Sequence, residues 1–180
     1  DVSDAEVKAF YTRNVDKFKY PEKVRASHIL IAVNPEEITE VVKSEPENAN
    51  LSETEIKAKV DAQIKEKVAK ANSLLAEAKK DPASFAKLAK ENSDDTTSAQ
   101  KGGELGFFAK NEMVPEFANA AFKAKPNTVV GPVKSQYGYH IILVKDRMAA
   151  GQEPFEKVKS SIKDYLTNQK QLEQIDKLVE

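Results

Sequence analysis

The segment from Gln100 to Met113, QKGGELGFFAKNEM, limits the folds open to this chain more than any other. It holds three of the six glycines, Gly102, Gly103 and Gly106, which permit left-handed and closely approached backbone conformations that other residues resist. Four large apolar residues stand among and after them: Leu105, Phe107, Phe108 and Met113. A glycine turn that leads into a short apolar strand can present its apolar side chains together as one hydrophobic surface. Taken alone, these side chains are most simply interpreted as core.

Composition narrows the classes of protein to which the chain can belong. With 180 residues it can form one sizeable domain with an appendage. Lysine and arginine number 28 against 29 acidic residues, so the basic surface typical of a nucleic-acid binder is not expected. No apolar run approaches the roughly 18 residues of a membrane-spanning helix. Cysteine is absent, which favours an exported protein, and the polar start DVSDAEV predicts that the chain begins after processing or part-way through a longer protein.

The only two histidines in the chain lie in two similar apolar segments on either side of the glycine turn. His28 is embedded in VRASHILIAV, and His140 in GPVKSQYGYHIILVKDR. Such near-continuous runs of β-branched and aliphatic residues predict central strands that are covered on both faces. Within the first strand, His28 and Leu30 are expected on one face, with Ile29 and Ile31 on the other.

Two capping boxes predict where helices begin. Ser3 is followed three residues later by Glu6, which opens an N-terminal helix with one apolar face. Ser52 and Glu55 repeat the pattern and open a helix that runs to about Lys80. The first half of this second helix is expected to extend into solvent or onto a partner.

The remaining segments are interpreted from their periodicity. Residues 34–50 carry prolines, asparagines and acids without a sustained period, so we expect a loop with at most one short helical turn. Further helices are predicted at 84–91, at 115–122 and from about Pro154 to the C-terminus. An apolar stripe follows the last of these helices: Phe155, Val158, Ile162, Leu166, Leu172, Ile175 and Val179.

Four motifs occur in order along the chain: ASHIL, SDDTTSAQKGGELG, MVPEF and SQYGYHIILV. Together they resemble the parvulin family of peptidyl-prolyl cis-trans isomerases, from Val24 to Arg147, with one long insertion at about 34–70. The resemblance implies an α+β fold in which a four-stranded antiparallel sheet is surrounded by helices. An isomerase domain of residues 21–147 is therefore expected.

The residues that lead into this domain resemble exported bacterial foldases of the PrsA, SurA and PpiD type. Those residues are Tyr11, Asn14, Phe18, Pro21, Glu22 and Val24. In such foldases this segment links a helical chaperone domain to the isomerase. The resemblance implies that 1–20 and 148–180 form the two helices of a partial chaperone module and pair with each other. It also implies a location in the bacterial periplasm or cell envelope.

The resemblance assigns an apolar proline pocket to Leu105, Met113 and Phe117. Without the family, these three residues would be interpreted as core. Phe122 is expected to close the pocket floor or to fill the core behind it. Tyr137 stands where phenylalanine is usual, and it would add a hydroxyl at the rim of the site.

The polar residues of the site are also assigned by resemblance. His28 and His140 match a pair of family histidines and are predicted to hydrogen-bond to each other and organise the floor of the site. Ser135 stands where a threonine usually joins this network. Asp95 occupies the position that other parvulins fill with cysteine, with Asp94 as its rival and a turn-capping role as the alternative. Beside an apolar pocket, desolvation is expected to raise the pKa of Asp95.

The expected chemistry requires little besides a shaped pocket. Isomerisation of an X–Pro bond needs no nucleophile and no cofactor, and two histidines without a matched ligand set are not a zinc signature, so neither cofactor nor metal is expected. The expected partners are unfolded or extended proline-containing polypeptides, with no nucleic acid and no membrane segment, and the terminal helices could join two copies as a homodimer.

Three functions remain open from the sequence. The first is isomerisation of prolyl bonds in exported proteins, and the second is a holdase chaperone that binds peptides with little turnover. The third is a pure assembly role for the terminal helices. Residues 34–56 hold seven glutamates and one lysine, which would repel a phosphorylated substrate.

Overall fold

The computed structural model describes residues 1–179 and divides the chain into two compact units. One unit combines Asp1–Glu22 with the chain from Ala149 onward, and the other is continuous from Lys23 to Met148. The candidate site lies in the continuous unit. The assignment of the terminal segments to a chaperone module stays a prediction.

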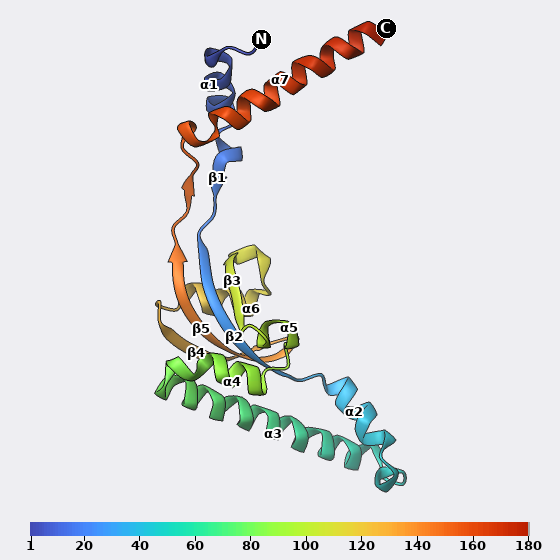
Figure 1. Cartoon of the computed structure of the whole chain (residues 1–180). Helices are drawn as coiled ribbons and strands as arrows, with labels where there is room; N and C mark the ends of the chain where they lie inside the picture. Colours follow the sequence, from blue (N-terminus) through green and yellow to red (C-terminus); the bar gives the residue numbers. More distant parts are fainter. Residues whose placement is uncertain (180) are drawn as a thin grey trace. The chain divides into compact units, whose positions relative to one another are not determined.

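The centre of the continuous unit is an antiparallel sheet of four strands in the order β3-β2-β5-β4 (Figure 1). The strands are β2 (Lys23–Ala32), β3 (Glu104–Ala109), β4 (Thr128–Ser135) and β5 (Gly138–Met148). This confirms the predicted α+β fold. In the register of the two central strands, Leu30 pairs with His140 and His28 with Ile142. Since paired residues project to the same side, both imidazoles emerge on one face of the sheet.

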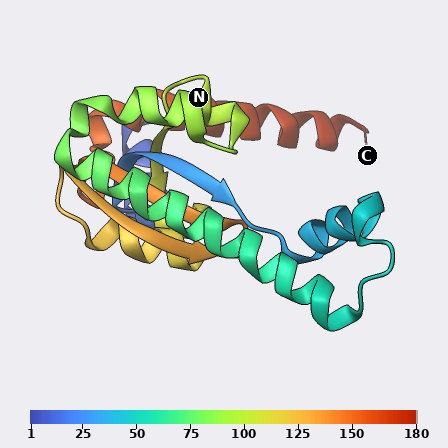
Figure 2. The same cartoon turned by 90° about the horizontal axis from the view of Figure 1, so that it is seen from below.

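Helices cover both faces of this sheet. Figures 1 and 2 show α3 (Glu53–Lys80) and α4 (Phe85–Asn92) on one side and α6 (Pro115–Lys123) on the other. The first side buries Ile29, Ile31, Leu74, Phe85 and Ile141, and the second buries Val24, Phe108, Phe117, Ile142 and Val144. Short elements complete the unit: α5 (Thr96–Ala99) and 3₁₀ turns at Pro46–Asn48, Pro82–Ser84 and Lys110–Glu112. The two covered faces explain why the central strands are apolar on both sides.

The segment after β2 differs from the predicted loop, because it forms the ten-residue helix α2 (Pro35–Ser44). Asn34 caps this helix: its side-chain oxygen accepts hydrogen bonds from the backbone N–H groups of Glu36 and Glu37 at 3.1 and 3.2 Å. Proline is well suited to the first helical position, since its missing N–H would have no helical partner there. Pro35, Glu36 and Glu37, which suggested a loop, are therefore helix-start residues.

Helix α2 packs on the first half of α3 (Figure 1). That half was predicted to extend into solvent or onto a partner, whereas a helix of the same chain covers one of its faces. Ile38 and Val42, one turn apart, are buried against Ile56 and Val60 of α3. In the turn between the two helices, the buried Asn48 side chain donates a hydrogen bond to the Val42 carbonyl at 2.9 Å. The insertion is thus a helical hairpin with a small core of its own.

The other unit is formed by the N-terminal and C-terminal segments of the chain. Helices α1 (Asp4–Arg13) and α7 (Phe155–Val179) pack on each other, and a 3₁₀ turn at Val15–Phe18 follows α1. Strand β1 (Lys19–Tyr20) pairs antiparallel with β6 (Gly151–Gln152). A small core forms between them from Val2, Val7, Phe10, Tyr11, Phe18, Phe155, Val158, Ile162 and Leu166.

Only the first half of the apolar stripe on α7 takes part in this core. Leu172, Ile175, Leu178 and Val179 are exposed in the described chain. The predicted pairing of the terminal helices therefore accounts for the stripe up to Leu166, and the remainder is left without a covering element among residues 1–179.

Candidate active site

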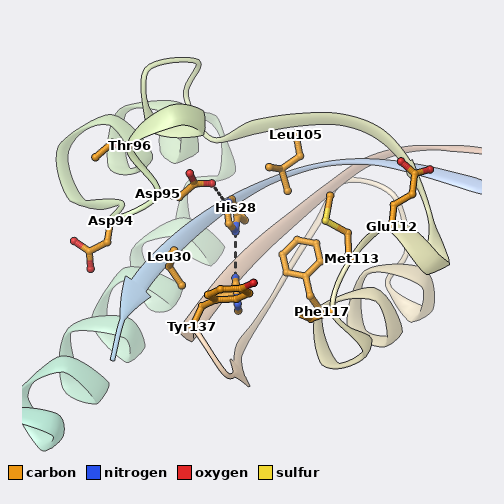
Figure 3. A pocket seen from close by; sticks show the side chains of 12 residues that line it. His28, Leu30, Asp94, Asp95, Thr96, Leu105, Glu112, Met113, Phe117 and Tyr137 are labelled. Atoms are coloured by element: carbon orange, nitrogen blue, oxygen red, sulfur yellow. Dashed lines mark hydrogen bonds and ion pairs between the residues drawn. The ribbon is translucent and has the colours of Figure 1, made fainter. Parts of the chain in front are cut away.

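The α6 side of the central strands opens into a cavity of about 500 Å³, shown in Figure 3. Residues from β2, β3, β5, α5, α6 and their connecting segments line it. They are His28, Leu30, Asp94, Asp95, Thr96, Leu105, Glu112, Met113, Val114, Phe117, Tyr137 and His140. Seven of the nine residues singled out from the sequence thus surround one cavity, although they are spread over more than a hundred positions of the chain.

The two histidines form the centre of a hydrogen-bonded chain of side chains. The Nδ1 atoms of His28 and His140 lie 3.2 Å apart, and the rings are stacked with their centroids 5.4 Å apart. At one end, His28 Nε2 lies 2.7 Å from Asp95 Oδ2, which also accepts a hydrogen bond of 2.6 Å from the Ser98 hydroxyl. At the other end, Ser135 Oγ lies 2.7 Å from His140 Nε2.

The carboxylate of Asp95 gives this chain a direction when both imidazoles are neutral. An ionised carboxylate only accepts hydrogen bonds, so His28 Nε2 must carry the proton and donate to Asp95. His28 Nδ1 is then an acceptor, His140 Nδ1–H donates to it, and His140 Nε2 accepts from the Ser135 hydroxyl. Each tautomer is therefore set by its neighbour, which fixes both rings in position.

The pKa of Asp95 is lowered, contrary to the expectation that desolvation would raise it. Burial does raise the pKa of this carboxyl, but the hydrogen bonds from Ser98 and His28, with the charge of His28, outweigh it. Asp95 is consequently ionised at neutral pH. It acts as an acceptor that orients His28 and cannot donate a hydrogen bond to a substrate carbonyl.

Burial lowers the pKa of His140 from 6.5 to about 4, the charge of His28 adds to this effect, and Asp95 opposes it. The unfolded chain therefore binds more protons than the folded one between about pH 6.5 and 4. We expect the free energy of unfolding to fall as the pH drops through this window, by at most about 1.4 kcal/mol per pH unit. The lowered pKa of Asp95 acts in the same direction, but only at the acidic end of this window, because an unfolded aspartate takes up its proton near pH 3.8.

Urea unfolding midpoints at several pH values between 7 and 4.5 would measure this dependence. The variant His140→Asn, which cannot take up the proton, should show a shallower dependence over the same window. An identical slope in both proteins would contradict the assignment of the titration to His140.

The opposite wall of the cavity is apolar, as Figure 3 shows. Leu105, Met113 and Phe117 all lie on it. The ring of Phe117 is 2% exposed and meets both imidazoles edge-on, with centroids 5.5 Å from His28 and 5.1 Å from His140. It therefore forms part of the cavity wall and of the core at once.

Two of the residues singled out from the sequence do not line the cavity. Phe122 lies on the core side of α6, with its ring centroid 6.0 Å from that of Phe108. Its position five residues after Phe117 turns it away from the cavity, so the pocket-floor assignment is replaced by the core alternative. Ser135 is absent from the lining but contacts it through His140.

The glycine segment sets the distance between the loop and the histidine strand. Gly103 has φ +86°, a conformation that favours glycine, and a Cβ at this position would collide with the backbone of His28. The backbone N–H of His28 donates to the Gly103 carbonyl at 2.9 Å. The turn thus brings the segment that carries Asp95, and the start of β3 with Leu105, against β2.

The structure adds five lining residues that were not assigned to the site. Leu30 shares the face of His28, so strand alternation could have identified it. Asp94 was considered only as a rival of Asp95, yet both line the cavity. The remaining three, Thr96, Glu112 and Val114, had no signal beyond their closeness in sequence to assigned residues.

Within residues 1–179, no group of three or more histidine, cysteine, aspartate or glutamate side chains lies close enough to hold a metal ion. The helices of the same range also include none that is both long and apolar enough for a membrane span.

Comparisons with known proteins agree with this arrangement. Residues 11–148 match the family described as the PPIC-type PPIASE domain. Cbf2 of Campylobacter jejuni, which carries the name of a peptidyl-prolyl cis-trans isomerase, is 36% identical over 166 residues, or 92% of this chain and 50% of Cbf2. Foldase protein PrsA of a Geobacillus strain is 37% identical over 161 residues, or 89% of this chain and 43% of that protein.

A solved structure from work on PEB4 and Cj1289 matches with a TM-score of 0.59 at 34% identity, over 98% of this chain and 59% of that chain. Those two proteins are described as SurA-like chaperones of Campylobacter jejuni. The chain spans about half the length of the curated relatives it matches. Since the family match extends over most of the sequence and includes every residue of the cavity, the chain belongs to the family of PPIC-type peptidyl-prolyl cis-trans isomerase domains, the parvulins.

Proposed function

We propose that this chain isomerises X–Pro bonds of unfolded exported polypeptides, non-covalently and without specificity for phosphate, in the bacterial periplasm or cell envelope. The observation that carries the proposal is the joining of an apolar wall and a fixed histidine pair in one cavity of about 500 Å³. The location is supported by the names of its relatives, which include foldase proteins and SurA-like chaperones.

The reaction needs a pocket rather than a reactive group. Amide resonance sets a barrier of about 18–20 kcal/mol, and the uncatalysed process takes tens of seconds or longer. An enzyme lowers this barrier by holding the proline ring and stabilising the twisted amide, in which nitrogen and carbonyl are no longer conjugated. Here Leu105, Met113 and Phe117 would hold the ring, beside a rigid polar floor formed by His28 and His140.

Three further residues would act through this floor or at its edge. Ser135 orients His140, and Asp95 orients His28 while keeping a negative charge beside the amide. The exposed Tyr137 ring would cover the substrate at the rim. None of these roles involves a covalent intermediate or a cofactor.

Two-dimensional NMR exchange spectroscopy on Ala-Ala-Pro-Phe peptides would test the proposal without an auxiliary protease. Catalytic amounts of the protein should produce exchange cross-peaks between the cis and trans forms. If the peptide binds but exchanges no faster than in buffer, the isomerase proposal fails.

Phosphoserine before proline should give a substrate poorer than alanine. The cavity lining contains the carboxylates of Asp94, Asp95 and Glu112, and the neighbouring α2 is rich in glutamate, so a phosphate would meet negative charge. We expect a kcat/KM at least about fivefold lower for the phosphoserine peptide. NMR exchange with the two peptides measures this ratio. A higher kcat/KM for the phosphoserine peptide would contradict the proposed lack of phosphate specificity.

A second function, that of a holdase chaperone, is supported by the exposed half of α7. Leu172, Ile175, Leu178 and Val179 are exposed together near its end, and contiguous apolar surface of this kind commonly binds other chains. The same residues would serve a homodimer through the terminal helices. Sedimentation equilibrium would separate these two uses: a dimer mass supports the homodimer, and a monomer mass leaves the surface free for an unfolded client.

A further inference from the structure

One end of the cavity is built differently from the apolar wall. Leu30 and Asp94 line it there, on the side of His28 away from Met113, and Figure 3 shows the Tyr137 ring between Leu30 and Phe117. The strand register agrees with this placement, because β3 pairs with β2 from Lys23 to Ser27, before His28, whereas Leu30 lies beyond His28. We call Leu30, Asp94 and Tyr137 the Leu30 corner.

Backbone contacts hold the Leu30 corner in place. The Asp94 N–H donates to the Leu30 carbonyl at 2.7 Å, and Asp94 Oδ2 accepts from the Ala32 N–H at 2.7 Å. The Val33 N–H donates to the Tyr137 carbonyl at 3.1 Å. A carboxylate and an aromatic residue are thus both anchored to the end of β2, within three residues of Leu30 along the chain.

The two polar partners of the Leu30 corner remain available to a ligand. Asp94 is an exposed residue, and its second oxygen, Oδ1, has no hydrogen-bond or ion-pair partner among residues 1–179. Tyr137 is 54% exposed. Of the cavity-lining residues in the described chain, three carry carboxylates and none is lysine or arginine.

An apolar residue, a free carboxylate oxygen and an exposed aromatic ring together suit the side chain of lysine or arginine. The aliphatic stem of either residue can lie on an apolar surface such as Leu30 while its charged end reaches solvent or a partner. A carboxylate attracts that charge, and the face of a tyrosine ring attracts it as well. The negative field continues past the cavity, since Glu36 and Glu37 stand in the exposed first turn of α2, directly after β2.

We propose that the Leu30 corner is a specificity subsite that selects prolyl bonds with a lysine or arginine next to the proline. The inference rests on the proposed isomerase function of the same cavity. The proline ring occupies the Met113 and Phe117 wall, and the adjacent basic side chain extends along β2 to Asp94 and Tyr137. Asp94 and Tyr137 are therefore specificity-determining residues, whereas the histidine pair serves every substrate.

The test compares peptides that carry lysine, alanine or glutamate immediately before or immediately after proline. Isomerisation is measured by NMR exchange, and binding by chemical-shift titration in the same samples. We expect kcat/KM for the better lysine peptide to exceed that of the matching glutamate peptide about tenfold at low salt. Raising the salt to about 0.5 M should shrink the ratio, because exposed charges are then screened within a few ångströms.

The variant Asp94→Asn removes the charge but keeps an oxygen that can accept from the Ala32 N–H. It should reduce the lysine-to-glutamate ratio to about threefold or less, whatever its absolute rate. Glu91→Gln is the matched control, since Glu91 is exposed, lies three residues before Asp94 and is outside the cavity lining. It should leave the ratio unchanged.

The outcomes separate this inference from the isomerase function. If all peptides are isomerised with equal efficiency, the specificity subsite is overturned and the function stands. If none is isomerised, the proposed function fails, and the binding ratio from the titrations still decides the charge preference. A ratio that is equal in the unaltered chain and in Asp94→Asn overturns the role of Asp94.

Discussion

Replacement of Met113 with alanine is expected to lower kcat/KM for X–Pro peptides by about tenfold or more. Met113 lies half-buried in the cavity wall, where its side chain would contact the proline ring. Loss of this apolar contact would cost about 1–3 kcal/mol, and 1.4 kcal/mol corresponds to a factor of ten. Peptide binding should weaken together with turnover, because both depend on the same contact. NMR exchange and titration measure the two quantities.

The chain contains its own matched control for this variant. Met148, the only other methionine, is exposed at the end of β5 and is absent from the cavity lining. Met148→Ala should leave exchange rates unchanged. Phe117→Ala should also reduce turnover, but Phe117 is core, and its loss would cost about 3–5 kcal/mol of stability. A folded and fully active Met113→Ala protein would show that the pocket is assigned wrongly.

The fragment Lys23–Met148 is expected to isomerise short peptides at close to the rate of the whole chain, while losing any ability to suppress aggregation of an unfolded client. The fragment keeps the sheet, both of its covered faces and the entire cavity. It lacks α7 and therefore the exposed residues Leu172 and Ile175. Holding an unfolded chain needs more exposed apolar surface than one proline pocket offers. Light scattering of an aggregating client protein measures the loss.

A variant of the full chain separates loss of surface from loss of the unit. Leu172→Ser combined with Ile175→Ser changes only exposed positions, so it should leave folding intact and reduce aggregation suppression. The reverse result, in which the fragment loses isomerisation but still suppresses aggregation, would mean that the terminal helices are structural parts of the catalytic unit.

Local sequence patterns were sufficient for the two central strands and for several helix starts. The apolar runs around His28 and His140 predicted two central strands, because a strand covered on both faces can carry apolar residues at every position. The capping boxes at Ser3 and Ser52 are present with both of their reciprocal hydrogen bonds. These features depend on residues within a few positions of one another, so the order of the amino acids determines them.

Contacts between residues far apart in the sequence decided helix α2 and the direction of the Asp95 pKa shift. Helix α2 has only two buried side chains, Ile38 and Val42, and their burial depends on α3, so no sustained period marked it. The predicted direction of the Asp95 pKa shift was also wrong. Burial beside an apolar pocket can be anticipated from sequence, whereas the hydrogen bonds that outweigh it come partly from His28, 67 positions away.

The site itself shows the same division. The motifs identified the histidines, the apolar wall and Asp95 as candidates. Only the folded chain places Phe122 in the core and attaches Asp94 and Tyr137 to the end of β2, close to Leu30. That corner exists because Asp94 and Tyr137 reach the end of β2 from two distant loops, each through a backbone hydrogen bond. Backbone pairing of this kind is independent of side-chain identity, so the sequence alone determined which residues could form a site, and the tertiary structure decided which of them meet.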